Sequence, residues 1–293
     1  MNWQGVIPAI TTPFRADLSV DHDFLAKHAS WMIDNDCTGI VALGSLGEGA
    51  TLELDEKIAV LQTCVRAARL PVAAAISALS TQAAVRLAKA AADAGCSGLM
   101  VLPPYVYSTD WREMKAHVTA VIRATSLSCM LYNNPIAYRT DFLPEQIAEL
   151  AEEHGNLHAV KESAGDVRRI AAIRELIGQR LAIFVGVDDL IVEGIAAGAA
   201  GWIAGLVNAL PRESVVLFDR AARGENVFDL YRWFLPLLRL DTVPKFVQLI
   251  KLVQAEVGMG NERVRPPRLE LAGTEREAAL RVIRAALGSR PRV

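Results

Sequence analysis

Short apolar runs alternate with segments of helical spacing along most of this chain. The apolar character of eight such runs is continuous rather than alternating, which is typical of parallel strands buried on both faces. We expect these strands at Val6–Ile10, Gly39–Leu43, Val72–Ile76, Gly98–Leu102, Ser128–Tyr132, Leu157–Lys161, Leu181–Gly186 and Ala200–Ala204. The intervening segments predict helices at Asp23–Ile33, Asp55–Ala68, Ala83–Ala94, Trp111–Ala124, Pro144–Glu153, Val167–Ile177 and Leu190–Ala197.

The repeated strand–helix pattern predicts an α/β fold, a closed (β/α)8 TIM barrel. No Gly-x-Gly-x-x-Gly follows the first strand, which disfavours an open dinucleotide-binding sheet. More residues follow the eighth strand than one closing helix requires, so we expect a C-terminal helical extension. We assign 1–210 to the barrel core and 211–293 to the last barrel helix and packed C-terminal helices, in a single structural unit. The helices of this region are predicted at Glu213–Arg223, Val227–Leu240, Pro244–Val257 and Glu275–Leu287.

Composition limits the possible partners. The 293 residues are 52% hydrophobic and carry a formal charge of −2, which argues against nucleic acid because phosphate binding needs a basic face. The cysteines (Cys37, Cys64, Cys96 and Cys129) are scattered in apolar segments, as in proteins of a reducing compartment. The N-terminus shows no signal-peptide pattern, and the apolar stretch 194–207 is too short for a membrane span. We expect a cytoplasmic protein with a small-molecule partner and no membrane contact.

Polar residues at the predicted strand ends supply the candidate chemistry, because active sites of such barrels lie at the carboxyl ends of the strands. Lys161 ends the sixth strand, so its stem starts in an apolar run while its amine reaches toward the barrel mouth. Desolvation there would lower the pKa of the amine, and a neutral amine can attack a ketone to form an imine. The alternative is a lysine that only extends its charged head into solvent.

Two further strand ends could assist such an amine. Tyr132 ends the fifth strand, and its phenol could shuttle protons during imine formation, unless the backbone merely satisfies its hydroxyl. Gly44, Ser45 and Gly47 form a turn whose backbone N–H groups could approach a carboxylate, although many strand–helix turns are glycine-rich. Glu48 in this turn is better explained as a structural hydrogen-bonding residue than as a catalytic carboxylate.

Metal binding has little support in the sequence. The histidines show no His-x-His or His-x-x-x-His pairing. Asp188 and Asp189 could form a metal pair, but they open a helix after a strand, where capping and the helix dipole favour acidic residues. We expect no metal site.

The strand-end motifs together resemble the dihydrodipicolinate synthase / N-acetylneuraminate lyase family. The resemblance covers essentially the whole chain, from Gly5–Phe14 to the Arg265-Pro266-Pro267 turn. Its motifs are Gly44-x-x-Gly47-Glu48, Tyr132-Asn133-x-Pro135 and Lys161-Glu162. The resemblance implies that Lys161 is the Schiff-base lysine, that Tyr132 is a proton shuttle, and that the Gly44–Gly47 loop binds the carboxylate of a 2-oxo acid such as pyruvate. It also implies a homotetramer built as a dimer of dimers, without metal or organic cofactor.

Departures from the synthase pattern concern the substrate. Ser45 and Leu46 stand where the synthase has two adjacent threonines, and leucine cannot hydrogen-bond a carboxylate. The second tyrosine of the synthase falls on Val106, and the arginine that holds the carboxylate of its aldehyde substrate falls on Ala137. Losing such a charge-assisted contact typically costs ~1.5–3 kcal/mol. A relative that acts on sugar-derived or other 2-oxo acids fits better than the synthase.

The leading hypothesis is a class I lyase that makes or breaks a C–C bond beside a pyruvate-derived enamine, or dehydrates a 2-keto-3-deoxy sugar acid. The alternatives are 4-hydroxy-tetrahydrodipicolinate synthase, an imine-dependent deaminase of the same family, and a catalytically silent barrel that serves as a binding module. These enzymes would share Lys161 and Tyr132 and differ in the substrate-binding wall. We assign to that wall Leu46, Tyr105, Tyr107, Tyr138, Arg139, Ile203 and Leu206.

Overall fold

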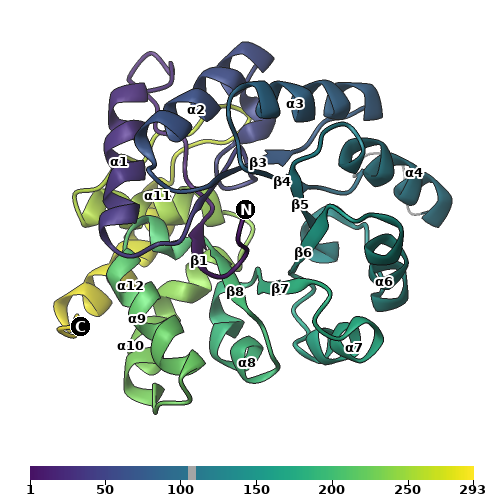
Figure 1. Ribbon diagram of the computed structural model, residues 1–293. Coiled ribbons are helices and arrows are strands. Elements are labelled where there is room, and N and C mark those ends of the chain that lie inside the picture. Colours follow the sequence, from purple (N-terminus) through teal and green to yellow (C-terminus); the bar gives the residue numbers. More distant parts are fainter. Residues whose placement is uncertain (105–109) are drawn as a thin grey trace.

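The structure is a computed structural model that describes residues 1–104 and 110–293. Within these residues eight strands form one parallel sheet in the order β1-β8-β7-β6-β5-β4-β3-β2. A bridge from Ala9, just past β1, to Val41 of β2 brings the two edges of the sheet together. The helices surround the resulting barrel (Figure 1). The predicted (β/α)8 TIM barrel with a C-terminal helical extension is confirmed.

Each predicted strand is present, because the continuous apolar runs are buried between the barrel interior and the surrounding helices. The ends differ from the prediction by no more than two residues. The strands are β1 (Gly5–Pro8), β2 (Ile40–Ala42), β3 (Val72–Ile76), β4 (Gly98–Val101), β5 (Ser128–Asn133), β6 (Leu157–Glu162), β7 (Ala182–Val185) and β8 (Gly201–Ala204).

The helices also follow the prediction, with Ser80 and Asp110 as side-chain N-caps of α3 and α4. Those between the strands are α1 (His22–Asp34), α2 (Leu54–Ala67), α3 (Thr81–Asp93), α4 (Trp111–Ile122), α6 (Pro144–Glu153), α7 (Arg168–Ile177) and α8 (Ile191–Ala196). The unforeseen elements are α5 (Pro135–Tyr138) and the 3-10 turns η1 (Gly49–Thr51), η2 (Asp188–Leu190), η3 (Leu206–Asn208) and η4 (Arg239–Asp241).

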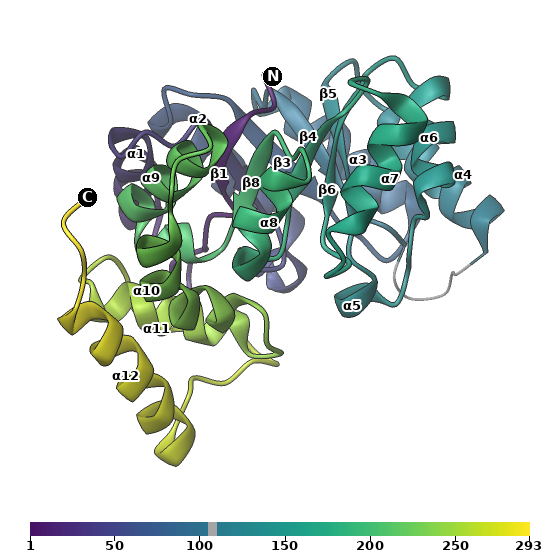
Figure 2. The same cartoon turned by 90° about the horizontal axis from the view of Figure 1, so that it is seen from below.

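The C-terminal region contributes α9 (Pro211–Ala222), α10 (Phe228–Leu238), α11 (Phe246–Glu256) and α12 (Gly273–Gly288). α9 contacts β1, as the last helix of a barrel should. Figure 2 shows α11 on the same side of the strands as α5, which follows the carboxyl end of β5. The C-terminal helices therefore lie near the barrel end where chemistry is expected. Among the described helices, none combines the length and the apolar composition needed to cross a membrane.

Candidate active site

Lys161 and Tyr132 lie side by side at the carboxyl ends of β6 and β5. The two strands pair in parallel with Tyr132 directly opposite Lys161. The Nζ atom of Lys161 lies 4.1 Å from the centroid of the Tyr132 ring. Both side chains are buried, with 6% and 5% exposure. The structure thus brings together the two residues that the sequence singled out for catalysis.

Gly186, just past β7, makes room for the lysine stem. A Cβ at this position would collide with Cε of Lys161 and with Oγ of Ser163. The absence of a side chain on the neighbouring strand therefore lets Lys161 lie across the barrel end instead of turning outward. The alternative of a lysine extending into solvent does not fit this geometry.

Burial is the main influence on the Lys161 amine, and it lowers the pKa of Lys161 below that of an ordinary lysine. Negative charge on Tyr138, Asp241 and Asp188 opposes this shift. Among the described residues, Lys161 has no hydrogen-bond or ion-pair partner that would hold it as an ammonium. The amine is therefore poised to lose its proton and act as a nucleophile.

Tyr132 belongs to a row of three hydroxyl groups. Its oxygen accepts a hydrogen bond from Nδ2 of Asn134 at 3.0 Å, which leaves the phenolic proton free for another partner. The ring of Tyr138 meets it edge-on, with centroids 5.7 Å apart and an interplanar angle of 90°. The Tyr138 hydroxyl in turn is hydrogen-bonded to Oγ of Ser45. Burial raises the pKa of Tyr132, so the phenol keeps its proton until a base takes it.

The short helix α5 places Tyr138 in this row. Pro135 occupies its first turn, and the Asn134 side chain caps it by accepting a hydrogen bond from the Ala137 N–H at 2.9 Å. Arg139 ends the helix in a left-handed conformation, with φ of 59°. As a result Tyr138 lies beside Tyr132, whereas Arg139 is exposed. The sequence had placed Tyr138 only in the pocket wall.

The Gly44–Gly47 loop adjoins this row through Ser45. Gly44, Leu46 and Gly47 are buried, and the Gly47 carbonyl accepts a hydrogen bond from Oγ1 of Thr12 at 2.6 Å. Thr12 therefore holds the backbone of the loop in place, while the Ser45 side chain contacts Tyr138. Backbone fixed in this way is suited to bind a small anion, although the carboxylate-binding role remains a prediction.

Glu48 has a structural role, as predicted. Its side chain is fully buried and forms an ion pair with Nζ of Lys251 at 2.6 Å. Its second oxygen accepts a hydrogen bond from the Arg265 N–H at 3.0 Å. Glu48 thus ties the loop after β2 to the C-terminal region and has no free oxygen for catalysis.

Glu162, the residue after the lysine, anchors the ends of β5 and β6. Its carboxylate accepts hydrogen bonds from Nδ2 of Asn133, at 3.1 and 3.2 Å, and from the Ala164 N–H at 2.7 Å. Arg169 donates to it at 3.2 Å and also pairs with Asp141 at 2.9 Å. Burial raises the pKa of Glu162, while Arg169 opposes the rise. This network fixes the backbone from which Tyr132 and Lys161 project.

Asp188 is a buried carboxylate that the sequence did not assign to the site. It accepts hydrogen bonds from Nε1 of Trp202 at 2.9 Å and from the Leu206 N–H at 2.8 Å. The Gly205 N–H donates to it as well. Burial raises its pKa to about 6. Within the residues that the structure describes, no three His, Cys, Asp or Glu side chains gather as potential metal ligands.

Of the remaining residues predicted to line the pocket wall, some are buried at the barrel end and others lie outside the described residues. Ile203 on β8 and Leu206 of η3 are fully or almost fully buried at the barrel end. Tyr105 and Tyr107, together with Val106, lie outside the described residues.

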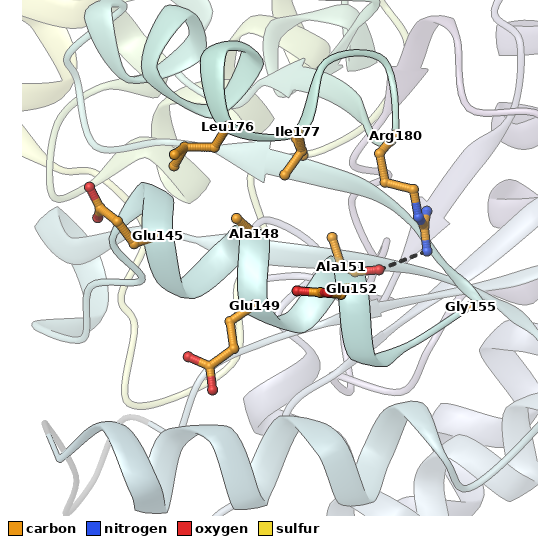
Figure 3. A pocket seen from close by; sticks show the side chains of 9 residues that line it. All are labelled: Glu145, Ala148, Glu149, Ala151, Glu152, Gly155, Leu176, Ile177 and Arg180. Carbon is orange, nitrogen blue, oxygen red and sulfur yellow. Dashed lines mark hydrogen bonds between the residues drawn. The ribbon is translucent and has the colours of Figure 1, made fainter.

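A groove on the outer side of the barrel has a structural explanation. It runs between α6 and α7, with Glu145, Glu149 and Leu176 among its lining residues (Figure 3). Arg180 at one end donates hydrogen bonds to the carbonyls of Ala151, His154 and Leu157 at 3.0, 2.9 and 2.7 Å. This arginine therefore caps α6 and is not free for a ligand, and the groove contains none of the strand-end residues.

A parallel eight-stranded barrel with a buried amine beside a phenol at its carboxyl end defines the class of protein, a class I lyase that works through a Schiff base. The model of the dihydrodipicolinate synthetase family matches residues 2–286. The chain belongs to this family.

Individual relatives agree with the family assignment. The chain is 34% identical over 227 residues to the 4-hydroxy-tetrahydrodipicolinate synthase of Clostridium perfringens, with 77% of each chain covered. A putative dihydrodipicolinate synthetase from Pseudomonas aeruginosa has a similar crystal structure, with a TM-score of 0.91 and 30% identity over 98% of this chain and all of that one. The chloride-inhibited dihydrodipicolinate synthase of Acinetobacter baumannii, crystallised with pyruvate, gives a TM-score of 0.91 at 29% identity, covering 97% and 98%.

Proposed function

We propose that Lys161 forms a Schiff base with the oxo carbon of a 2-oxo acid and that Tyr132 moves the protons this step requires. The observation that carries the proposal is the 4.1 Å separation between the buried amine and the phenol ring. A pyruvate complex of a structural relative supports a small 2-oxo acid as the substrate.

The amine attacks the carbonyl carbon, and the Tyr132 hydroxyl donates a proton to the carbinolamine oxygen so that water can leave. The resulting iminium draws electrons from the adjacent carbon, which allows a bond there to form or break. Tyr138 and Ser45 extend the row of hydroxyls toward the 44–47 loop, where the substrate carboxylate would lie. They would return the proton to Tyr132 after each transfer.

Within the family we favour a substrate derived from a sugar or another hydroxylated 2-oxo acid over aspartate semialdehyde. Ala137 stands where the synthase has the arginine that holds the aldehyde's carboxylate, and Arg139 is exposed. A deaminase or dehydratase would use the same imine. Release of pyruvate, water or ammonia from a panel of 2-keto-3-deoxy acids separates these reactions, and efficient condensation of pyruvate with aspartate semialdehyde would contradict our preference.

Borohydride reduction in the presence of pyruvate tests the proposal directly. The expected result is a stable mass increase located on Lys161 by peptide mapping, and its absence in Lys161→Ala. An unmodified chain under trapping conditions would instead favour a catalytically silent binding module.

We further propose a cytoplasmic homotetramer, built as a dimer of dimers, that works without an organic cofactor. The family resemblance supports this assembly. Light scattering after size-exclusion chromatography should give four times the chain mass of 31.8 kDa. A monomer mass at micromolar concentration would contradict it.

A further inference from the structure

Asp241 brings a carboxyl group from the C-terminal region to the end of β8. It is the last residue of η4, and it lies far in sequence from the other residues of the site. A Cβ placed on Gly205, which follows β8, would collide with the Asp241 carboxyl. The carboxyl is therefore seated directly against the backbone at the carboxyl end of the barrel.

The hydrogen bonding of Asp241 is incomplete. Its Oδ1 atom is buried and has no hydrogen-bond partner among the described residues. The neighbouring Asp188 already takes the backbone donors of Gly205 and Leu206. Buried polar atoms in folded proteins are nearly always paired, so an unpaired one calls for a specific explanation. A ligand group bound beside Oδ1 supplies the missing partner.

Asp241 is also close enough to the reactive groups to influence both of them. When it is ionised, Asp241 raises the pKa of Lys161 and that of Tyr132. Burial, followed by the charge on Asp188, raises the pKa of Asp241 itself well above that of an ordinary aspartate. A carboxyl that retains its proton can both donate and accept a hydrogen bond.

From this geometry we propose that Asp241 binds a hydroxyl group on the part of the substrate that extends beyond the Schiff-base carbon. The inference rests on the proposed Schiff-base function and names the substrate class of the same site. A hydroxyl matches a carboxyl that offers one donor and one acceptor. A second carboxylate does not, because it can accept the proton of this carboxyl but has none to donate in return, and it would lie beside the carboxyl group of Asp188.

The experiment measures trapping at Lys161 with cyanoborohydride for three 2-oxo acids of equal chain length: 2-keto-3-deoxygluconate, 2-oxohexanoate and 2-oxoadipate. In the wild type we expect half-maximal trapping at the lowest concentration for the hydroxylated acid and at the highest for 2-oxoadipate. In Asp241→Ala the preference for 2-keto-3-deoxygluconate over 2-oxohexanoate should fall by about tenfold, which is the scale of one hydrogen bond to a buried group. Asp241→Asn, which keeps a donor and an acceptor, should retain most of the preference.

Asp229→Asn is the matched control, because this aspartate is exposed in the first turn of α10 within the same helical region. It should trap all three acids like the wild type. An unchanged preference in Asp241→Ala, or wild-type trapping of 2-oxoadipate as efficient as that of the hydroxylated acid, would overturn the inference. Pyruvate trapping at Lys161 is measured in parallel for each variant, so failure of the Schiff-base proposal itself would be seen separately.

Discussion

Two buried lysines, Lys161 at the end of β6 and Lys251 on α11, have opposite surroundings. Lys251 forms an ion pair with Glu48 at 2.6 Å and donates to two backbone carbonyl oxygens at 2.9 and 2.6 Å. Its three ammonium protons are therefore all used. Among the described residues, the Lys161 amine contacts only the face of the Tyr132 ring, at 4.1 Å, and is influenced electrostatically by Tyr138, Asp241 and Asp188. Burial alone does not make an amine reactive.

The difference shows what a nucleophilic lysine requires. Burial lowers the pKa of both lysines, and the Glu48 carboxylate opposes this only for Lys251. An amine whose donors are all engaged cannot release a proton or reach a substrate without breaking the pair. The sequence motif predicted Lys161 as the nucleophile, and the structure gives a physical reason why Lys251, which is also buried, would not compete for that role.

The largest expected effect is the loss of turnover in Lys161→Met. We expect turnover to fall by about 10⁴-fold or more, as when a covalent nucleophile is removed. The free energy of unfolding should stay equal or rise, because an amine without a close partner is replaced by an apolar chain. Steady-state kinetics and urea unfolding measure the two quantities. Retained trapping of pyruvate on another lysine would show that Lys161 is not the Schiff-base residue.

Lys251→Met should have the opposite profile. Removing one partner leaves Glu48 charged and buried, which typically costs about 3–5 kcal/mol of stability. Urea unfolding should show this loss, while the folded fraction still traps pyruvate at Lys161. Adding Glu48→Gln should restore part of the stability, since no charge is then left unpaired. Normal stability in the single variant would mean that the ion pair contributes little.

The pH dependence of trapping separates the two lysines further, since only a neutral amine attacks. Because its pKa is lowered, Lys161 should react faster as the pH rises, and the rate should reach a plateau below the usual lysine pKa of about 10.4. At pH values far below the plateau, the rate should change about tenfold per pH unit. The lowered pKa of Lys161 also predicts that the free energy of unfolding increases with pH. Between the two pKa values the unfolded chain binds more protons than the folded one, so folding is favoured as the pH rises. A plateau at or above the ordinary value would contradict the role of burial.

The barrel and the closeness of Lys161 and Tyr132 could be predicted because their signals are local. Continuous apolar runs mark the strands, and the strand ends then place Lys161 and Tyr132 at one end of the barrel. By contrast, α5 is too short to show a period, so the sequence placed Tyr138 in the pocket wall but did not predict its contact with Tyr132. Asp241 was missed for a different reason. The helix predicted at 227–240 ends at Leu238, and the contact of Asp241 with Gly205 joins distant parts of the chain.

The smallest effect is expected for the outer hydroxyls of the row. Tyr138→Phe and Ser45→Ala should each lower turnover by about tenfold, on the scale of one hydrogen bond, whereas Tyr132→Phe should lose about 10²–10⁴-fold as a direct proton donor. Because their hydroxyls are hydrogen-bonded to each other, the double variant should be little worse than either single one. Ile136→Ala, an exposed change on the same short helix, is the control. Fully additive losses would mean that Tyr138 and Ser45 act separately, and the row would then end at Tyr132.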